Sequence, residues 1–261
     1  MRTLICGGRD FHDVEYAVDQ LYRIDQICEF SLIISGGARG ADHLGEEYAR
    51  ASLIPLVVCK AEWKKFGNRA GILRNQRMLD EQKPDLVIAL PGGTGTAHMV
   101  GIARAAHVEV VEFRYIKFKK EDPQWGFLSN FYPSPIVDED GCVWSTSEHF
   151  YQSRKTFDER ARSRIQKAAT PAEARALGRN ATKTIKRPDW ESVKDQVMRE
   201  ALELKFAKSS WMAEQLLSSG HDYLLEFSSW DSYWGSGKDG TGRNQLGKLL
   251  MERRNELLLD T

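Results

Sequence analysis

Over the first 113 positions, the apolar residues follow two kinds of spacing that alternate along the chain. Short runs of nearly continuous apolar residues predict strands that are buried on both faces. Between them, apolar residues recur every three or four positions, which predicts amphipathic helices. The predicted strands are residues 2–6, 31–35, 55–59, 85–90 and 108–113, and the predicted helices are residues 14–30, 41–52, 70–82 and 96–106. This alternation predicts a parallel sheet covered by helices, and hence an α/β, Rossmann-like first domain.

The pattern changes after residue 113. Residues 114–124 form a charged stretch that predicts a linker. Beyond it, aromatic residues become frequent and helical periods dominate. The predicted helices are residues 148–158, 161–168, 171–178, 190–207, 211–218 and 244–259. We therefore expect one domain over residues 1–113, a linker over 114–124, and a mainly helical α+β domain over 125–261.

Composition and charge narrow the class of protein. Of the 261 residues, 41% are hydrophobic and 28% are charged, as in a soluble globular protein, and the formal net charge is zero. Because neither half is strongly basic, we expect no strong nonspecific attraction to a polynucleotide, and such a substrate would have to bind through local contacts at the site. No apolar run is long enough to cross a bilayer, and the first residues lack a signal-peptide pattern. We therefore expect a cytoplasmic protein without a membrane partner.

The four cysteines form no CxxC pair, and we expect them to be free thiols rather than disulfides or zinc ligands. No other segment predicts a metal site.

Glycine pairs follow three of the predicted strands. Glycine lets the backbone approach a ligand closely, and the N-terminus of a following helix attracts phosphate. Because ligands of such sheets bind at the carboxyl ends of the strands, the pairs mark a candidate nucleotide site. Tight turns without a ligand are the alternative. The candidate binding residues are Gly7, Gly8, Arg9, Gly36, Gly37, Arg39, Gly92, Gly93, Thr94, Gly95 and Thr96.

These motifs, together with Trp63 and the AGxxRN pattern of residues 70–75, resemble the YspA-like branch of the SLOG superfamily over nearly all of residues 1–113. The superfamily includes nucleotide sensors and phosphoribohydrolases with the motif PGGxGTxxE. The glutamate of that motif corresponds to Met99 here. The resemblance therefore implies binding of a nucleotide or an NAD-derived ligand, without glycosidase chemistry in this half.

Three segments of the second half carry candidate chemistry. The first is FLSNFYP, residues 127–133, in which Phe131 could stack on a base and Asn130 could read a base edge. An ordinary hydrophobic turn is the alternative reading of this segment.

The second segment is SEHFYQSRK, residues 147–155, which Thr146 or Ser147 would cap as a helix. At helical spacing, Glu148, Gln152 and Lys155 share one face. A solvated Glu/Lys face is the alternative, and we expect His149 to be structural.

The third segment, residues 231–247, holds five glycines among aromatic and acidic residues directly before a helix. The candidates here are Asp231, Trp234, Gly235, Asp239 and Asn244, which could hold a ribose or a phosphate or, for Asn244, cap the helix. The acidic spacing does not match an EF-hand.

Together with residues 170–179, 187–206 and 216–231, these segments closely resemble the NADAR (YbiA-like) family from about residue 125 to 254. Members of that family are N-glycosidases, and we expect that catalysis here requires no cofactor. Some hydrolyse ribosylamino-pyrimidine phosphates of riboflavin synthesis, and others remove ADP-ribose from guanine. We expect catalysis by Glu148, Lys155 and Asp231, with Arg179 and Arg187 as candidate phosphate contacts.

We therefore expect a hydrolase that removes ADP-ribose from guanine in a nucleotide or nucleic acid. One alternative is an N-glycosidase of riboflavin intermediates, and another is a nucleotide-sensing or defence module with little turnover. In the expected mechanism Glu148 is the acid/base, and Lys155 acts either by charge or as a Schiff-base nucleophile. Trp234 and Phe131 stack on the base, and Asp231 or Asp239 holds ribose hydroxyls. The sequence leaves the oligomeric state open, a homo-oligomer included.

Overall fold

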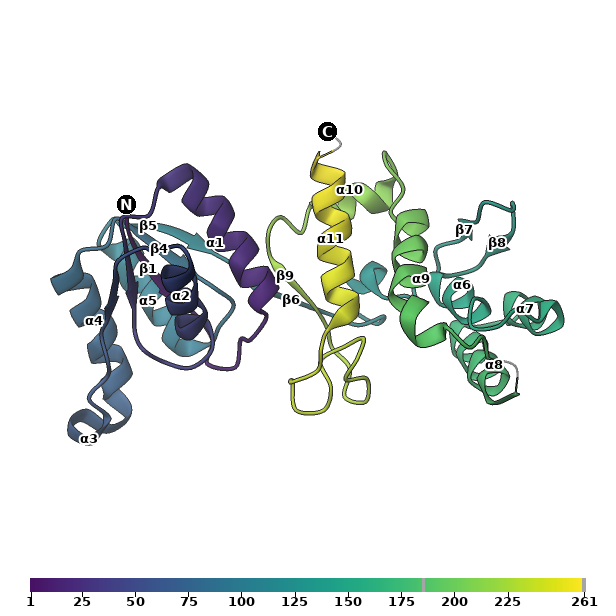
Figure 1. Ribbon diagram of the computed structural model, residues 1–261, viewed down its shortest axis with the longest axis horizontal. Helices are drawn as coiled ribbons and strands as arrows, with labels where there is room; N and C mark the ends of the chain where they lie inside the picture. The colour runs from purple at the N-terminus through teal and green to yellow at the C-terminus, as the bar shows by residue number, and fades with distance from the viewer. Residues whose placement is uncertain (185, 260–261) are drawn as a thin grey trace. The chain divides into compact units, whose positions relative to one another are not determined.

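The computed structural model describes residues 1–184 and 186–259, and the chain forms two compact units, Met1–Tyr115 and Ile116–Thr261 (Figure 1). Each unit is considered by itself. None of the helices in the described ranges is long and apolar enough to cross a membrane.

The first unit is built on a parallel sheet of five strands in the order β3-β2-β1-β4-β5. In the register of this sheet, Leu4 lies opposite Ile34 on one side and Val87 on the other, and all three are buried. The predicted α/β fold is confirmed. The strands are β1 (Arg2–Cys6), β2 (Leu32–Ser35), β3 (Leu56–Val58), β4 (Leu86–Ala89) and β5 (Glu109–Glu112).

Helices cover this sheet in two pairs, since α1 packs against α2 and α4 packs against α5. The side chain of Asp13 starts α1 by accepting the backbone N–H of Tyr16. The helices are α1 (Val14–Cys28), α2 (Ala41–Ala51), α3 (Trp63–Phe66), α4 (Ala70–Gln82) and α5 (Thr94–Ala105), with a 3₁₀ turn, η1, at Gly67–Arg69.

The strand order places a switch point between β1 and β4. From β1 the chain steps outward to β2 and β3, and then crosses to β4 on the other side of β1. At such a point the loops that leave neighbouring strands diverge and open a crevice at their carboxyl ends. The loops here are those of Gly7 and Gly8 after β1, and of Gly92 and Gly93 after β4.

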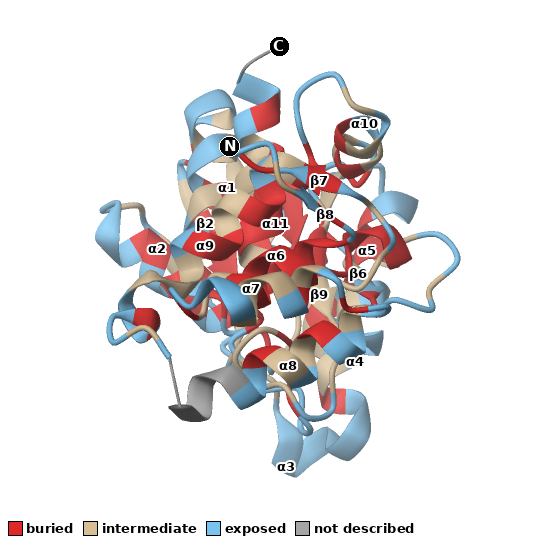
Figure 2. Ribbon diagram, turned by 90° about the vertical axis from the view of Figure 1, so that its right-hand side faces the viewer, coloured by how far each residue is buried: buried red, intermediate tan, exposed pale blue. Residues whose placement is uncertain are grey.

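The second unit is mainly helical and is arranged around α6 (Ser147–Ser153), all of whose residues are buried (Figure 2). This helix packs against α7, α8 and α9. Strands β6 and β9 form one small sheet, and β7 and β8 form another, so the α+β expectation is confirmed. The other elements are η2 (Gly126–Leu128), α7 (Glu159–Gln166), α8 (Pro171–Thr184), α9 (Trp190–Lys205), α10 (Trp211–Leu217), α11 (Gln245–Leu259), β6 (Tyr115–Phe118), β7 (Ile136–Val137), β8 (Val143–Trp144) and β9 (Tyr223–Glu226).

The segment predicted as a linker contains strand β6. Its residues Ile116 and Phe118 are buried while Lys117 between them is exposed, which is the period of a half-buried strand. The surrounding lysines and acidic residues hide this short alternation in the sequence. The carbonyl of Phe118 accepts the backbone N–H of Phe227 just beyond β9.

Two predicted helix ends in the second unit are also wrong. Helix α6 stops at Ser153 because the chain then pairs with the segment before α9: Lys155 O accepts Arg187 N, and Thr156 bridges to Lys186. Helix α8 continues past Gly178, the residue expected to end it. Gly178 instead allows α8 to pack closely against α6, since a Cβ there would lie 2.1 Å from Gln152 Oε1.

Candidate active site

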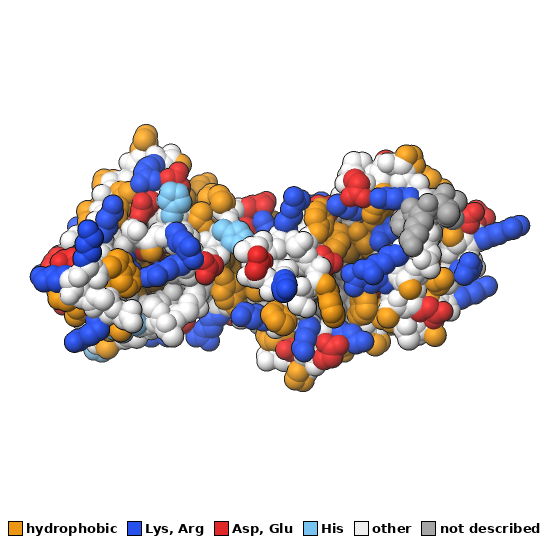
Figure 3. All heavy atoms as spheres, turned by 90° about the horizontal axis from the view of Figure 1, so that it is seen from below, with side chains coloured by type: hydrophobic (Ala, Val, Ile, Leu, Met, Phe, Trp, Pro, Cys, Tyr) orange, Lys and Arg blue, Asp and Glu red, His pale blue; other side chains and the backbone are white. Residues whose placement is uncertain are grey.

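A cavity of about 210 Å³ in the second unit collects most of the predicted residues of this half. The aromatic loop, α6, α8, α9 and the segment from β9 to Trp234 all contribute to it. Figure 3 shows Lys and Arg side chains gathered beside apolar surface on one face of this unit. The cavity is lined by Asn130, Phe131, Glu148, Tyr151, Gln152, Lys155, Arg175, Arg179, Met198, Glu226, Asp231 and Trp234.

Helix α6 is fixed at its start by Thr146 and His149. The Thr146 hydroxyl accepts the backbone N–H of His149 at 3.3 Å and lies 2.8 Å from the Nδ1 of the same ring. The ring's Nε2 lies 3.2 Å from Ala168 O, and burial lowers the pKa of His149. Because both ring nitrogens have protein partners, His149 is structural, as expected, and it orients the helix that carries Glu148.

Glu148 is a buried acid. Its Oε1 accepts a hydrogen bond of 2.7 Å from Gln152 Nε2. Burial raises the pKa of Glu148, while the bond from Gln152 and the charges of Arg175 and Lys155 oppose that rise. A carboxyl group in such surroundings keeps its proton to higher pH than an exposed carboxyl group does.

Lys155 lies just after α6, largely enclosed by aromatic rings. Its Nζ is 5.2 Å from the centre of the Tyr151 ring and 5.6 Å from that of Trp190. Burial lowers the pKa of Lys155 to about 8, against the attraction of Glu148. A substantial fraction of this amine is therefore neutral at mildly alkaline pH.

Asp231 organises the loop after β9. Its Oδ1 accepts the backbone N–H groups of Tyr233 at 3.0 Å and Trp234 at 2.8 Å, and its Oδ2 lies 3.5 Å from Arg175. The turn positions Trp234, whose ring meets that of Tyr151 edge-on at 5.5 Å between centroids. Asp231 thus contacts both Arg175 on α8 and the backbone of Trp234, whose ring lines the cavity.

Four lining residues are absent from the sequence prediction: Tyr151, Arg175, Met198 and Glu226. Tyr151 and Arg175 could have been found, because each follows the helical spacing of a predicted neighbour, Glu148 and Arg179 respectively. Glu226 gave no such signal, since it ends a four-residue strand. Burial, with repulsion from Asp231 and Glu148, raises the pKa of Glu226 to about 7, and Arg175 opposes this.

Four predicted residues lie outside the lining. Arg187 pairs with Asp189 at 2.7 Å, and exposed Asp239 accepts from the hydroxyl of Thr241. Gly235 packs against the backbone of β9, where a Cβ would lie 2.9 Å from Glu226 O. Asn244 precedes α11 with its side chain turned to β9: Oδ1 accepts Glu226 N, and Nδ2 donates to Leu224 O.

Two buried acceptors at the cavity are unused. Asn130 donates to Met198 Sδ, and Gln152 donates to Glu148, but Asn130 Oδ1 and Gln152 Oε1 have no hydrogen-bond partner among the described residues. Buried acceptors are normally satisfied, so both side chains suit a ligand that presents N–H groups.

The NADAR domain matches residues 117–258, which is more than half of the chain. The chain belongs to the NADAR family. It is 40% identical over 158 residues to the N-glycosidase YbiA of Shigella flexneri serotype 5b (strain 8401), covering 60% of this chain and 98% of that protein. The NADAR unit is an N-glycosidase.

Two further relatives support the assignment. The NMR structure of Escherichia coli YbiA is 41% identical with a TM-score of 0.51, and the match covers 56% of this chain and 86% of that one. A riboflavin biosynthesis protein of Vibrio vulnificus is 41% identical over 142 residues, or 54% of this chain and 38% of that protein.

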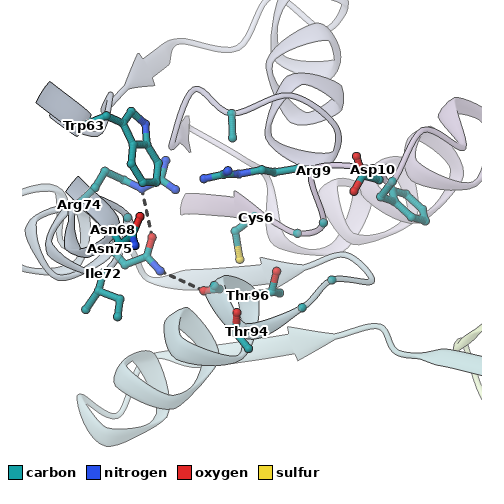
Figure 4. Close-up of a pocket in the computed structure, with 18 of the residues that line it drawn as sticks. Cys6, Arg9, Asp10, Trp63, Asn68, Ile72, Arg74, Asn75, Thr94 and Thr96 are labelled. Atoms are coloured by element: carbon teal, nitrogen blue, oxygen red, sulfur yellow. Dashed lines mark hydrogen bonds between the residues drawn. The ribbon is translucent and has the colours of Figure 1, made fainter.

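Ahead of the NADAR unit, the first unit has a cavity of about 600 Å³ at the β1/β4 switch point (Figure 4). It is lined by the predicted residues Gly7, Gly8, Arg9, Gly92, Gly93, Thr94, Gly95 and Thr96. A second cavity of about 610 Å³ is lined by Gly36, Gly37 and Arg39, and again by Arg9. The structure thus brings all predicted residues of this unit to two cavities that share Arg9.

Cationic and aromatic groups face the first cavity. The guanidinium of Arg9 lies 5.0 Å from the ring centre of Trp63. Arg74 donates to Asn75, which donates onward to the carbonyl of Gly95, so these side chains tie α4 to the start of α5. Close approach of backbone requires Gly92, because a Cβ there would lie 2.7 Å from Gly8 N.

Residues 1–66 match the YspA, cpYpsA-related SLOG family, so the N-terminal unit is a SLOG domain joined to the NADAR unit. Met99, at the position of the glutamate in the related hydrolase motif, is fully buried. It packs in a closed apolar cluster with Leu4, Val87 and Ala103, rather than lining the cavity.

Proposed function

We propose that the NADAR unit removes ADP-ribose from ADP-ribosylated guanine, in a nucleotide or in nucleic acid. The observation that carries this proposal is the cavity itself, where a buried acid and a lysine of lowered pKa lie beside two aromatic rings and two unused acceptors. Guanine offers ring and exocyclic N–H groups that would satisfy such acceptors.

The chemistry follows from the bond that breaks. Cleavage of a ribose–nitrogen bond builds positive charge at C1′ and requires a proton on the leaving nitrogen. Glu148 serves as the acid/base of this reaction. Lys155 has two roles open to it: its charged form holds oxygen atoms of the substrate, and its neutral form attacks a ring-opened C1′ as a Schiff-base nucleophile.

Recognition is divided among the walls of the cavity. Phe131 and Trp234 stack on the base, and Asn130 reads its edge. Arg175 and Arg179 line the cavity from α8, and their charges bind the phosphate groups of the substrate in this proposal. Asp231 holds Arg175 and orients it for that contact, in addition to any bond with ribose hydroxyls.

A second candidate substrate is a ribosylamino-pyrimidine phosphate. The name of the Vibrio vulnificus relative favours it. The same cavity suits it, because it also joins ribose through nitrogen to a ring that carries amino and keto groups.

The SLOG unit binds a nucleotide or an NAD-derived ligand in this proposal. Its support is the glycine-lined crevice at the switch point with Arg9, Trp63 and Arg74 around it. The burial of Met99 favours binding without turnover in this unit.

The test is a direct comparison of two substrates. The full chain is incubated with DNA that carries ADP-ribosylated guanine and, separately, with the ribosylamino-pyrimidine phosphate, and products are followed by mass spectrometry. Faster release of ADP-ribose with restored guanine supports the first substrate. Turnover of the pyrimidine phosphate alone assigns the second, and no turnover of either overturns both.

The control variants are Glu148→Gln and Glu203→Gln. Glu148→Gln should lower turnover by roughly two to four orders of magnitude, because it removes the group that exchanges the proton. Glu203 is an exposed residue of α9 outside the cavity, and its replacement should leave the rate unchanged.

A further inference from the structure

Three carboxyl groups line the NADAR cavity, and their surroundings differ. Asp231 is engaged on both oxygens, by two backbone N–H groups and by Arg175. Both oxygens of Asp231 are therefore occupied by protein partners, which leaves neither of them open to carry a proton to substrate.

Glu148 belongs to the side of the cavity that carries Lys155. Its Oε1 accepts a hydrogen bond from Gln152. Burial, the largest effect, raises the pKa of Glu148, and a carboxylate of raised pKa is a stronger proton acceptor once it is ionised. This arrangement suits a base, because one oxygen of Glu148 already accepts a hydrogen bond from Gln152 and the charge of Lys155 attracts the carboxylate.

Glu226 is the remaining acid, and its backbone is held firmly. Its N–H donates to Asn244 Oδ1 at 3.0 Å, and its carbonyl accepts Ser236 N at 2.9 Å. Its carboxyl group, by contrast, has no hydrogen bond or ion pair with any residue in the described ranges. The side chain is partly exposed where it lines the cavity. Because no side chain or backbone group in the described ranges occupies its oxygens, the carboxyl group is open to donate a hydrogen bond to a ligand in the cavity.

We propose that the acid/base role given above to Glu148 is divided between two residues: Glu226 is the catalytic acid that protonates the leaving nitrogen, and Glu148 keeps only the role of base. This inference rests on the proposed N-glycosidase reaction of the same cavity. The C1′–N bond breaks with its electron pair going to nitrogen, which takes the proton of Glu226. A water molecule adds to C1′ and gives its proton to Glu148. The two carboxyl groups then return to their starting states by exchange with solvent.

The pH profile follows from this division. Glu226 must carry its proton, and because its pKa is about 7, kcat/KM should fall as the pH rises above that value. Glu148 must be ionised, so the rate should fall on the acid side as well. The charged and titratable groups that face Glu226 are Glu148, Tyr151 and Lys155 from α6 and its end, Arg175 and Arg179 from α8, and Asp231 from the following loop.

The experiment separates proton donation from positioning by a change of leaving group. The full chain and its Glu226→Gln, Glu148→Gln and Glu203→Gln variants are assayed on the natural substrate that the unaltered protein turns over. They are then assayed on 4-nitrophenyl β-ribofuranoside 5-phosphate, whose phenolate leaves without a proton.

Glu226→Gln should lower kcat on the nitrogen-linked substrate roughly 10²- to 10⁴-fold and abolish the alkaline limb of its pH profile. It should leave turnover of the nitrophenyl compound close to that of the unaltered protein. Glu148→Gln should lose both activities, and Glu203→Gln neither.

Three results would overturn the assignment. Equal losses on both substrates would make Glu226 a positioning residue. Undiminished turnover of the nitrogen-linked substrate would remove it from the reaction, and so would an alkaline limb that persists in Glu226→Gln. An unaltered protein that hydrolyses no ribosyl–nitrogen substrate would instead overturn the proposed function, which is a separate result.

Discussion

Lys205 offers a prediction that can be worked out quantitatively. It is 3% exposed at the end of α9, and its ammonium group donates to Ser129 O at 2.8 Å. Burial lowers the pKa of Lys205 to about 7. Replacing it by methionine, which has a similar length and no charge, should remove the cost of burying an ammonium group.

The size of the effect follows from linkage. A fall in the pKa from 10.5 to about 7 corresponds to about 4 to 5 kcal/mol. The folded state bears this cost in full below pH 7, where both states are protonated. Between pH 7 and 10.5 the unfolded state binds more protons than the folded state, so the stability of the protein rises with pH. At pH 10.5 the cost of burying the charge has largely disappeared. Loss of the bond to Ser129 O costs about 1 to 3 kcal/mol. The Lys205→Met variant should therefore be about 2 kcal/mol more stable at pH 7.

The assay is denaturant unfolding followed by tryptophan fluorescence at several pH values from 7 to 9.5. Six of the seven tryptophans lie after residue 116, so the signal reports mainly on the NADAR unit. Other groups titrate in this range in both proteins, and the difference between the two isolates Lys205.

The stability advantage of the variant should shrink steadily as the pH rises. A difference that stays constant from pH 7 to 9.5 would refute the reasoning, because it would mean that the buried amine does not titrate with a lowered pKa. A variant that is less stable at every pH would mean that the bond to Ser129 O outweighs the buried charge.

Further predictions concern the two sites. Borohydride added during turnover should give a mass adduct on Lys155 if the amine attacks C1′, and its absence would end the covalent version of the mechanism. Gly178→Ala should push Gln152 away from Glu148, raise the pKa of that acid further, and move the acid limb of kcat/KM to higher pH; an unmoved limb would contradict this. Gly92→Ala should weaken binding of ADP-ribose to the SLOG unit in calorimetry, because its Cβ would crowd the backbone of the neighbouring loop, and unchanged affinity would argue against that crevice. Gly101→Ala is the matched control for both, since a Cβ at that helical glycine meets nothing within 4 Å.

Local patterns predicted much of the fold. The helix expected over residues 70–82 is observed as α4 with the same bounds, because its apolar period and its neighbouring turns agree. The glycine pairs correctly marked the loops at the carboxyl ends of β1, β2 and β4. Strand β6 was missed because two buried residues among charged ones give too short an alternation to stand out.

The candidate site was predicted where its residues share one helix. Glu148, Gln152 and Lys155 follow from helical spacing alone, and they do line one cavity. Glu226 could not be predicted in this way, because only the tertiary arrangement brings the end of β9 to the cavity that α6 also lines. Gly178 was misread for the same reason: its role is a close contact between α6 and α8, and the sequence shows only a glycine.

The buried position of Met99 has a consequence for how the SLOG unit can evolve. A glutamate introduced there would enter a closed apolar cluster without a partner, and an unpaired buried carboxyl group destabilises a fold by several kcal/mol. A Met99→Glu substitution would thus weaken the unit before it could contribute any chemistry. Acquiring a carboxylate at this position would therefore require compensating changes in the residues that pack around it.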